Sequence, residues 1–274
     1  MPTNPRHLIL KLFLGAEGAA VSSRVLVASC ALFGLRENSV RVAMVRLATA
    51  GMIEMEARGI YRLGPSAAAF AADVRTWRTA EARVRDDWTG SWVAAYCGAL
   101  GRSDRSALRR RGRALDLLGF RELDRGLWLR PDNLVGGVAH VRDRLYKLGL
   151  ESEAAVFAVP SFDPGREARA RALWNGKALT KSYVQTRQRL ERWLFGLHAL
   201  DLQAAARESF LLGDAAIRQL VYDPLLPDPL VNVDERRAFA GIVLEFDRTG
   251  HAIWRKLMTL LRPDAERSSA ATRH

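Results

Sequence analysis

The side chains best suited to chemistry in this chain lie on one face of a short predicted helix. From Val40 onward, apolar residues recur at i, i+3, i+4 and i+7, which is the spacing of one buried helical face. Arginine and asparagine on the opposite face could form paired hydrogen bonds with guanine and adenine edges in the major groove of DNA. The pattern therefore favours a helix that recognises double-stranded DNA. Its polar face would carry Asn38, Arg41, Val42, Val45, Arg46 and Thr49.

The segments around that helix predict the module that positions it. Ser22 and Ser23 are suited to cap a preceding helix that runs through Phe33. Gly34 then falls where a left-handed residue would end that helix, and Gly51 ends the next one. The two helices are thus expected to be joined by a tight turn.

Two short strands follow, at residues 52–56 and 60–63, joined by a glycine-containing hairpin at Arg58-Gly59. Helix, turn, helix and hairpin is the order of a winged helix-turn-helix, whose second helix enters the major groove. Glu54 and Glu56 would repel phosphates, so only the arginines of the hairpin are taken as contacts. The alternative is a small helical domain with a solvated polar face. The predicted DNA-binding residues are Asn38, Ser39, Arg41, Val42, Arg46, Arg58 and Arg62.

Composition favours a globular protein with a polyanionic partner. The chain has 274 residues, of which 49% are hydrophobic, and this is enough for two or three domains with a sizeable core. Its formal charge is +12. A positive charge favours binding to nucleic acid, because neutralising phosphates releases condensed counterions. An arginine-rich composition also follows from GC-rich coding, so the charge alone does not identify a DNA-binding protein. No uncharged apolar run approaches the roughly 20 residues of a membrane span, and the N-terminus lacks a signal-peptide layout. We therefore expect a cytoplasmic protein with no membrane partner.

The middle of the chain alternates in the order β-α-β-β-α-β, which predicts a ferredoxin-like sandwich. The last third is helical and is interrupted by Asp223-Pro224-Leu225-Leu226-Pro227-Asp228-Pro229, since three prolines cannot continue a helix. The fold class is therefore α+β. The predicted domains are a winged-helix domain at 1–64, a linker helix at 65–87, a ferredoxin-like domain at 88–163 and an all-helical domain at 164–274. The predicted elements after residue 64 are helices at 67–86, 103–118, 134–148, 177–200, 203–222 and 234–261, and strands at 92–96, 120–123, 127–129 and 154–159.

Other groups with chemical potential give weaker signals. The arginines within 109–113 could hold phosphates or form a solvated helix face, and Gly112 inside that helix hints at close packing. The five histidines are scattered, and the two cysteines, Cys30 and Cys97, lie in apolar stretches. We expect no catalytic residues, no metal site and no cofactor.

Three motifs resemble those of the PaaX-type repressors of phenylacetate catabolism. Trp88-Thr89-Gly90-Ser91-Trp92 is similar to the W-x-G-x-W entry to that family's middle domain. Leu117-Leu118-Gly119-Phe120 followed by Leu127-Trp128-Leu129-Arg130-Pro131 is similar to its LGF…G-x-W-x-x-P hairpin. The proline-rich segment from Asp223 resembles its DP-x-LP break. The resemblance spans nearly the whole chain.

The resemblance implies a winged-helix DNA reader, a ferredoxin-like middle domain and a helical C-terminal domain that work as a homodimer. In that family, an acyl-CoA thioester, typically phenylacetyl-CoA, releases the operator. Two departures stand out. Arg36 replaces a small capping residue before the recognition helix, and the stretch 230–235 lacks the Leu-Pro and Trp-Pro-Gly that normally follow the break. Phenylacetyl-CoA is therefore not carried over as the effector of this chain.

The sequence thus predicts a non-enzymatic regulator, a repressor of a catabolic operon. It would bind operator DNA and be released by a small metabolite such as an aromatic acyl-CoA. One alternative is a metal-dependent nuclease, because the middle domain also resembles the small ferredoxin-like nuclease of CRISPR adaptation. The strand at 92–96, however, has no carboxylate to hold a metal. Another is an RNA-binding module in which Trp92 and Tyr96 stack bases. The operator, the effector and its pocket, and the sign of regulation stay open.

Overall fold

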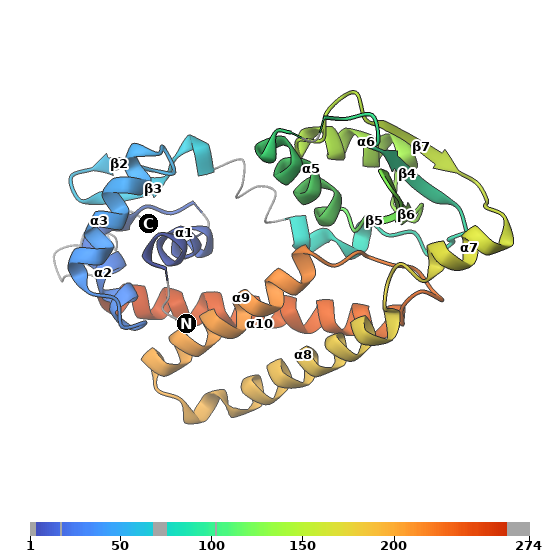
Figure 1. Ribbon diagram of the computed structural model, residues 1–274. Coiled ribbons are helices and arrows are strands. Elements are labelled where there is room, and N and C mark those ends of the chain that lie inside the picture. The colour runs from blue at the N-terminus through green and yellow to red at the C-terminus, as the bar shows by residue number, and fades with distance from the viewer. Residues whose placement is uncertain (1–3, 17, 68–75, 102, 262–274) are drawn as a thin grey trace. The chain divides into compact units, whose positions relative to one another are not determined.

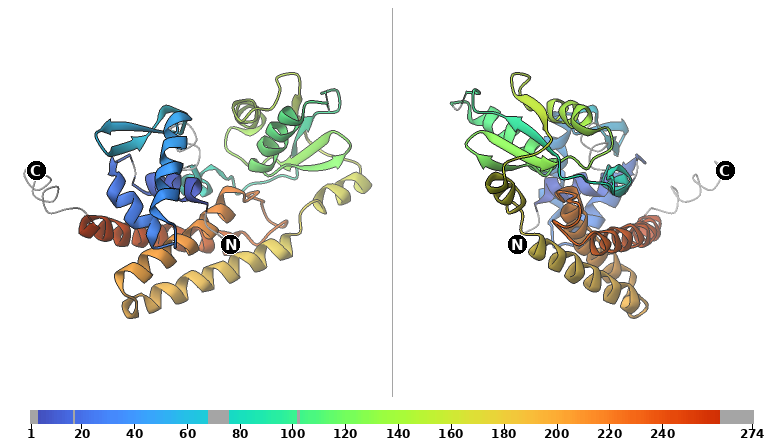
Figure 2. Two further views of the ribbon diagram at one scale, coloured as in Figure 1. Left: turned by 60° about the vertical axis from the view of Figure 1, so that its left-hand side comes forward. Right: turned by 90° about the vertical axis from the view of Figure 1, so that its right-hand side faces the viewer.

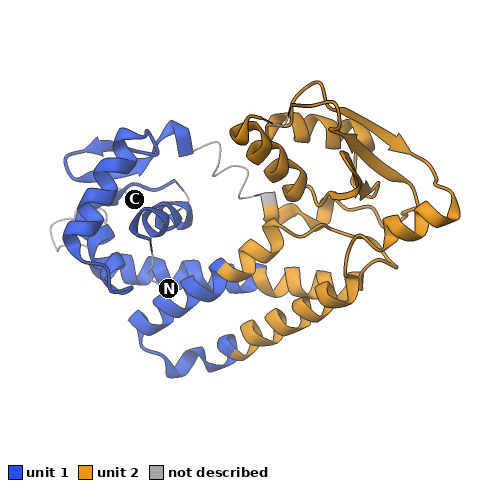
Figure 3. Cartoon of the chain, in the orientation of Figure 1, with its two compact units in different colours: residues 1–76, 193–214, 244–274 blue, residues 77–192, 215–243 orange. Residues whose placement is uncertain are grey.

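The computed structural model describes residues 4–16, 18–67, 76–101 and 103–261 (Figure 1). The chain divides into two compact units that are discontinuous in sequence (Figure 3). Unit 1 comprises residues 1–76, 193–214 and 244–274, and unit 2 comprises residues 77–192 and 215–243.

Unit 1 begins with three helices and a small antiparallel sheet, an arrangement like that of a winged helix-turn-helix. The sheet has the strand order β1-β3-β2. Gly34 (φ 74°) turns the chain between the second and third helices, and Gly51 (φ 65°) follows the third, as predicted. The elements are α1 (Pro5–Gly15), β1 (Val21–Ser22), α2 (Ser23–Ala31), α3 (Glu37–Thr49), β2 (Ile53–Ala57) and β3 (Ile60–Leu63).

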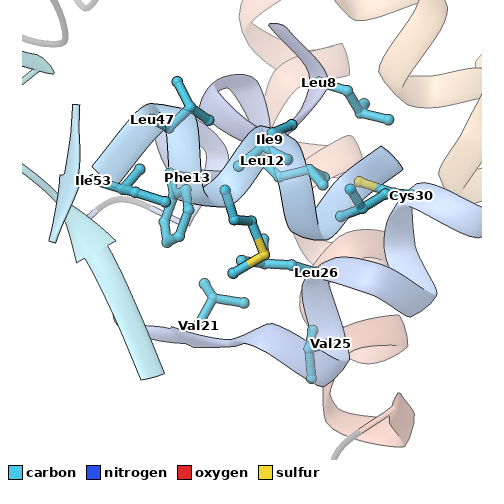
Figure 4. Packing of buried hydrophobic residues seen from close by; sticks show 13 residues of the cluster. Leu8, Ile9, Leu12, Phe13, Val21, Val25, Leu26, Cys30, Leu47 and Ile53 are labelled. Carbon is cyan, nitrogen blue, oxygen red and sulfur yellow. The ribbon is translucent and has the colours of Figure 1, made fainter. Parts of the chain in front are cut away.

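The core of unit 1 forms because each of the three helices buries one apolar stripe. Figure 4 shows Ile9 and Phe13 of α1, Leu26 of α2 and Leu47 of α3 gathered around a common centre. The face of α3 that was predicted to be buried is buried, at Val40, Ala43, Met44 and Leu47. The orientation of α3 is therefore fixed by its own apolar spacing.

Parts of the C-terminal helices complete unit 1. Phe33 packs edge-to-face on Phe210 and stacks on Trp254, with ring centroids 5.1 and 6.3 Å apart. Lys11 also forms an ion pair with Asp214. The boundary between the units falls inside all three long helices, which are α8 (Gly176–Gly196), α9 (Leu202–Val221) and α10 (Val233–Leu261). No helix among the described residues is long and apolar enough to cross a membrane.

Unit 2 contains the four-stranded antiparallel sheet, in the order β5-β6-β4-β7. The predicted β-α-β-β-α-β order of elements is present. The two helices lie against one face of the sheet, where Val93 and Ala95 meet Leu115 and Leu145 (Figure 2). The elements are β4 (Trp92–Tyr96), α5 (Arg105–Leu117), β5 (Arg121–Asp124), β6 (Leu127–Pro131), α6 (Gly137–Lys147) and β7 (Ala155–Val159).

One helix of unit 2 was not predicted. It is α7 (Pro164–Arg171), and its signal was present, because Asp163 accepts a hydrogen bond from the backbone NH of Arg166 and a proline occupies the first helical position. Trp174, just after this helix, stacks on Trp92 of the sheet with centroids 6.0 Å apart.

The predicted linker helix at 65–87 is wrong where the structure describes its second half. Residues 76–79 and 81–83 form short 3-10 turns, and Val84 is extended and bridges to Leu134. Contacts with the rest of unit 2 override helix propensity here: Trp77 is buried, and Arg85 donates its backbone NH to the Asn133 carbonyl. Residues 68–75 of the predicted helix lie outside the described residues.

Candidate nucleic-acid interface

Helix α3 is held by its apolar face and leaves the opposite face exposed. Asn38, Ser39, Arg41, Val42 and Arg46, which were predicted as contacts, are all exposed. Because the buried face packs on α1 and α2, the exposed side chains project from a fixed support. The structure thus brings the five helical residues together on one surface.

The two arginines of this surface differ in their partners. The Arg41 guanidinium lies 2.7 Å (Nε) from Glu37 Oε1, one turn earlier, and both side chains are more than half exposed. The side chain of Arg46 has neither a hydrogen bond nor an ion pair with any described residue. Exposed pairs of this kind are worth at most about 1 kcal/mol, so Arg41 can exchange Glu37 for another anion at small cost.

The helix starts without the usual side-chain cap. Arg36 occupies the N-cap position and forms no capping hydrogen bond through its side chain, although its carbonyl accepts the backbone NH groups of Ser39 and Val40. The first-turn NH groups are therefore not all satisfied by the chain. Backbone NH groups at a helix N-terminus can bind phosphate oxygens.

The β2–β3 hairpin, called the wing (residues 53–63), lies beside α3 in sequence and packs on the same core. Glu54 and Arg62 stand directly opposite one another, and Arg62 Nε lies 2.7 Å from Glu54 Oε1. Gly59 (φ 75°) turns the hairpin, and its carbonyl accepts the backbone NH of Ser23. Arg58 is exposed at the turn. The wing therefore carries two exposed arginines, of which Arg62 is paired with Glu54.

Two arginines of the run on α5 are bound within the chain. Arg111 is buried and pairs with Glu151 at 2.6 Å, and Arg110 donates to the Ser106 hydroxyl. Gly112 is not closely packed, since a Cβ placed there would meet nothing within 4 Å. Of the two alternatives for the run, a phosphate site or a solvated helix face, the buried Arg111 fits neither, and the close packing inferred for Gly112 is wrong.

The described residues give little support to the two alternative functions, an RNA-binding module and a metal-dependent nuclease. Trp92 is fully buried against Trp174, so it cannot stack bases as the RNA-binding alternative requires. Among the described residues, no three histidine, cysteine, aspartate or glutamate side chains are grouped to hold a metal ion.

Val45 was not among the predicted contacts, although it is the most exposed large apolar residue of α3. Its side chain is 66% exposed, against 51% for Val42. The signal was available, because Val45 follows Val42 by three residues and so shares its face.

Comparison with known proteins covers both ends of the chain. Residues 4–67 match the model of the PaaX-like protein family, and residues 174–256 match that of the PaaX-like protein C-terminal domain. The fold is similar to that of an uncharacterized protein, Rv0674 from Mycobacterium tuberculosis, with a TM-score of 0.59 and 24% identity over 91% of this chain and 98% of that one. No curated protein matches the sequence. The chain belongs to the PaaX-like protein family, whose members are transcriptional regulators.

Proposed function

We propose that this protein binds operator DNA through α3 and represses a catabolic operon until a small metabolite releases it. The observation that supports DNA binding is the division of α3 into a buried apolar face and an exposed face with Asn38, Arg41 and Arg46. Family membership implies DNA binding, and most members of the family are not enzymes. In this proposal residues 1–64 form the winged-helix domain and residues 88–163 the ferredoxin-like domain, with helices from 164 onward.

The two kinds of contact have different roles. Arg41, Arg46 and Asn38 would meet base edges, because paired donors can distinguish guanine and adenine in the major groove. Ser39, near the uncapped helix start, and Arg58 and Arg62 on the wing would meet phosphates and fix the position of the helix. Val42 would lie among the base contacts. A homodimer would place two recognition helices on a palindromic site.

The DNA-binding proposal is tested by fluorescence anisotropy. A duplex selected from a random library by the protein provides the probe, at stated salt. Arg46→Ala and Arg41→Ala should each weaken binding by about 5- to 150-fold if the arginine contacts a base. Arg189→Ala, an exposed arginine of α8, is the charge-matched control and should bind within about twofold of the parent. Unchanged binding of both α3 variants would exclude α3 as the recognition helix.

For the effector, we propose an anionic metabolite such as an aromatic acyl-CoA. A groove of about 660 Å³ in unit 2 is lined by Arg171, Lys177 and Lys181 and by residues 229–232. Lys177 and Lys181 are exposed and have no ion-pair partner among the described residues, so they can meet phosphate groups. Arg171 lies over the Trp88 ring at 5.2 Å and pairs with Glu167 at 2.7 Å, so the two lysines are the cations of this groove that are open to a ligand. An effector acts here by preferring the state that binds DNA less well.

The effector proposal is tested by thermal unfolding with a panel of aromatic and aliphatic acyl-CoA thioesters. A ligand that binds only the native state raises the melting temperature. The double variant Lys177→Ala/Lys181→Ala should lose that rise, and Lys256→Ala on α10 should retain it. A rise that is equal in all three proteins would place the effector elsewhere.

A further inference from the structure

The exposed face of α3 carries an apolar ridge formed by Val42 and Val45. Both are among the large hydrophobic side chains that stay exposed, at 51% and 66%. Residues at i and i+3 of a helix are neighbours, about 5–6 Å apart at Cβ. Neither side chain belongs to the core cluster of unit 1. The ridge therefore lies outside the apolar core that stabilises the module.

The charges beside the ridge indicate what covers it. Arg41 precedes Val42, and Arg46 follows Val45, so a guanidinium group flanks each end. The nearest carboxylate on this face, Glu37, is already paired with Arg41. A partner that matches this surface must present apolar groups with negative charge on both sides.

The major groove of DNA has this pattern. Its walls are lined with phosphates, and each thymine places a C5 methyl group on its floor. Valine has a stiff χ1 angle, so it loses little freedom when it packs against such a methyl group. Charge complementarity thus favours DNA over an apolar protein helix as the occupant of this face.

We propose that Val45, together with Val42, determines sequence specificity by packing against the C5 methyl groups of thymines in the operator. This inference rests on the proposed DNA-binding function and names the bases that the ridge recognises. The methyl group is read by removal of apolar surface from water, so the contact needs no hydrogen bond. Arg41 and Arg46 supply the contacts with neighbouring bases or phosphates.

The experiment is a double-mutant cycle, in which the thymine methyl group is removed from the DNA and the valine side chain is shortened in the protein, singly and together. In the duplex selected by the protein, each thymine is replaced singly by deoxyuridine, which keeps every hydrogen-bonding group of the base. Affinity is measured by fluorescence anisotropy for the parent protein, Val42→Ala and Val45→Ala. Leu211→Ala, another exposed apolar residue of unit 1, is the matched control.

At one or two positions, deoxyuridine should weaken binding of the parent and of Leu211→Ala by about 3- to 10-fold. The same replacement should cost Val45→Ala or Val42→Ala less than about twofold, because the methyl contact is already lost. Both valines are exposed and alanine has the higher helix propensity, so unchanged melting temperatures are expected and verify folding.

Three outcomes would overturn the inference. Tolerance of deoxyuridine at every position would mean that no methyl group is read, while the DNA-binding function would stand. A penalty that persists in both valine variants would assign the effect to DNA shape. A change in oligomeric state of Val45→Ala by light scattering, with unchanged DNA affinity, would assign the ridge to a second copy of the chain. Failure to select any duplex would instead refute the proposed function itself.

Discussion

Arg236 and Glu81, which lie 155 positions apart in the chain, form a doubly hydrogen-bonded ion pair within unit 2. Arg236 Nε and Nη2 lie 2.9 and 3.0 Å from the two carboxylate oxygens of Glu81. The Arg236 side chain is fully buried, and its remaining nitrogen, Nη1, donates to the Leu226 carbonyl. The pair therefore fastens the segment that follows residue 76 to the start of α10.

Removing one member of this pair should destabilise unit 2 strongly. Glu81→Gln leaves a buried guanidinium without the carboxylate that is hydrogen-bonded to it, so the free energy of unfolding should fall by about 3 kcal/mol. The double variant Glu81→Leu/Arg236→Met should be more stable than Glu81→Gln, because the buried guanidinium is removed together with its bonded carboxylate and only the buried Asp223 remains. Urea unfolding monitored by tryptophan fluorescence measures both. Glu191→Gln, which alters an exposed pair with Arg187, should change stability by less than about 1 kcal/mol; an equal effect at both sites would show that burial of Arg236 is irrelevant.

Glu54 on the wing should weaken DNA binding through its negative charge. Glu54→Gln removes a carboxylate next to Arg62 and should raise affinity about 2- to 5-fold at low salt. Arg62→Ala should lower affinity without altering sequence preference and reduce the slope of log K against log salt by about 1. Anisotropy titrations at several salt concentrations give both quantities. Glu191→Gln again serves as control, and a lower affinity for Glu54→Gln would contradict a role of the wing near phosphates.

The Arg111–Glu151 pair should make unit 2 sensitive to acid. The hydrogen bond from Arg111 holds the pKa of Glu151 below its usual value of 4.5. A depressed carboxyl pKa contributes stability that is complete above pH 4.5 and is lost as the pH falls through the folded-state pKa. Glu151→Gln should therefore be less stable than the parent at pH 7, and the difference should shrink as the pH is lowered from 5 to 3. Urea unfolding of both proteins across this pH range measures the difference in the free energy of unfolding. If that difference does not depend on pH, the lower stability of Glu151→Gln comes from packing and not from the charge of Glu151.

Two helical glycines should respond oppositely to alanine. At Gly176, a Cβ would lie 1.7 Å from the Leu230 carbonyl oxygen, so the backbone must move and stability should fall by about 1–3 kcal/mol or more. At Gly112, the space is open, and alanine should stabilise α5 by about 0.5–1 kcal/mol. Thermal unfolding of the two variants measures the contrast. A destabilised Gly112→Ala would mean that a neighbour fills this space.

Several features could be predicted because they depend on residues close together in the chain. The 3–4 spacing from Val40 to Leu47 fixed which side of α3 is buried, and glycines at 34 and 51 marked the turns on either side. The predicted boundaries of the helices were less exact than their order. The helix predicted from 134 begins at Gly137, because Gly136 (φ 84°) is left-handed and Leu134 pairs with Val84.

Which arginines are available to a ligand was decided by the tertiary structure. Arg111 looks like its neighbours in the sequence but is buried against Glu151, which comes from a distant loop. Arg46, by contrast, is exposed. Charge density in the sequence cannot separate these cases, since the partner of each side chain is chosen by packing.

The sequence by itself determined the order of the helices and hairpin over residues 23–63, the order of the elements from β4 to β7 and the buried face of α3, because hydrophobic periodicity and turn residues act over one or two helical turns. Only the tertiary structure decided that the segment at 76–86 leaves the helical conformation, that Phe33 packs on Phe210 and Trp254, and that Arg236 is buried against Glu81. These contacts join residues far apart in the chain, and their free energy outweighs local propensity, which contributes less than about 1 kcal/mol per residue.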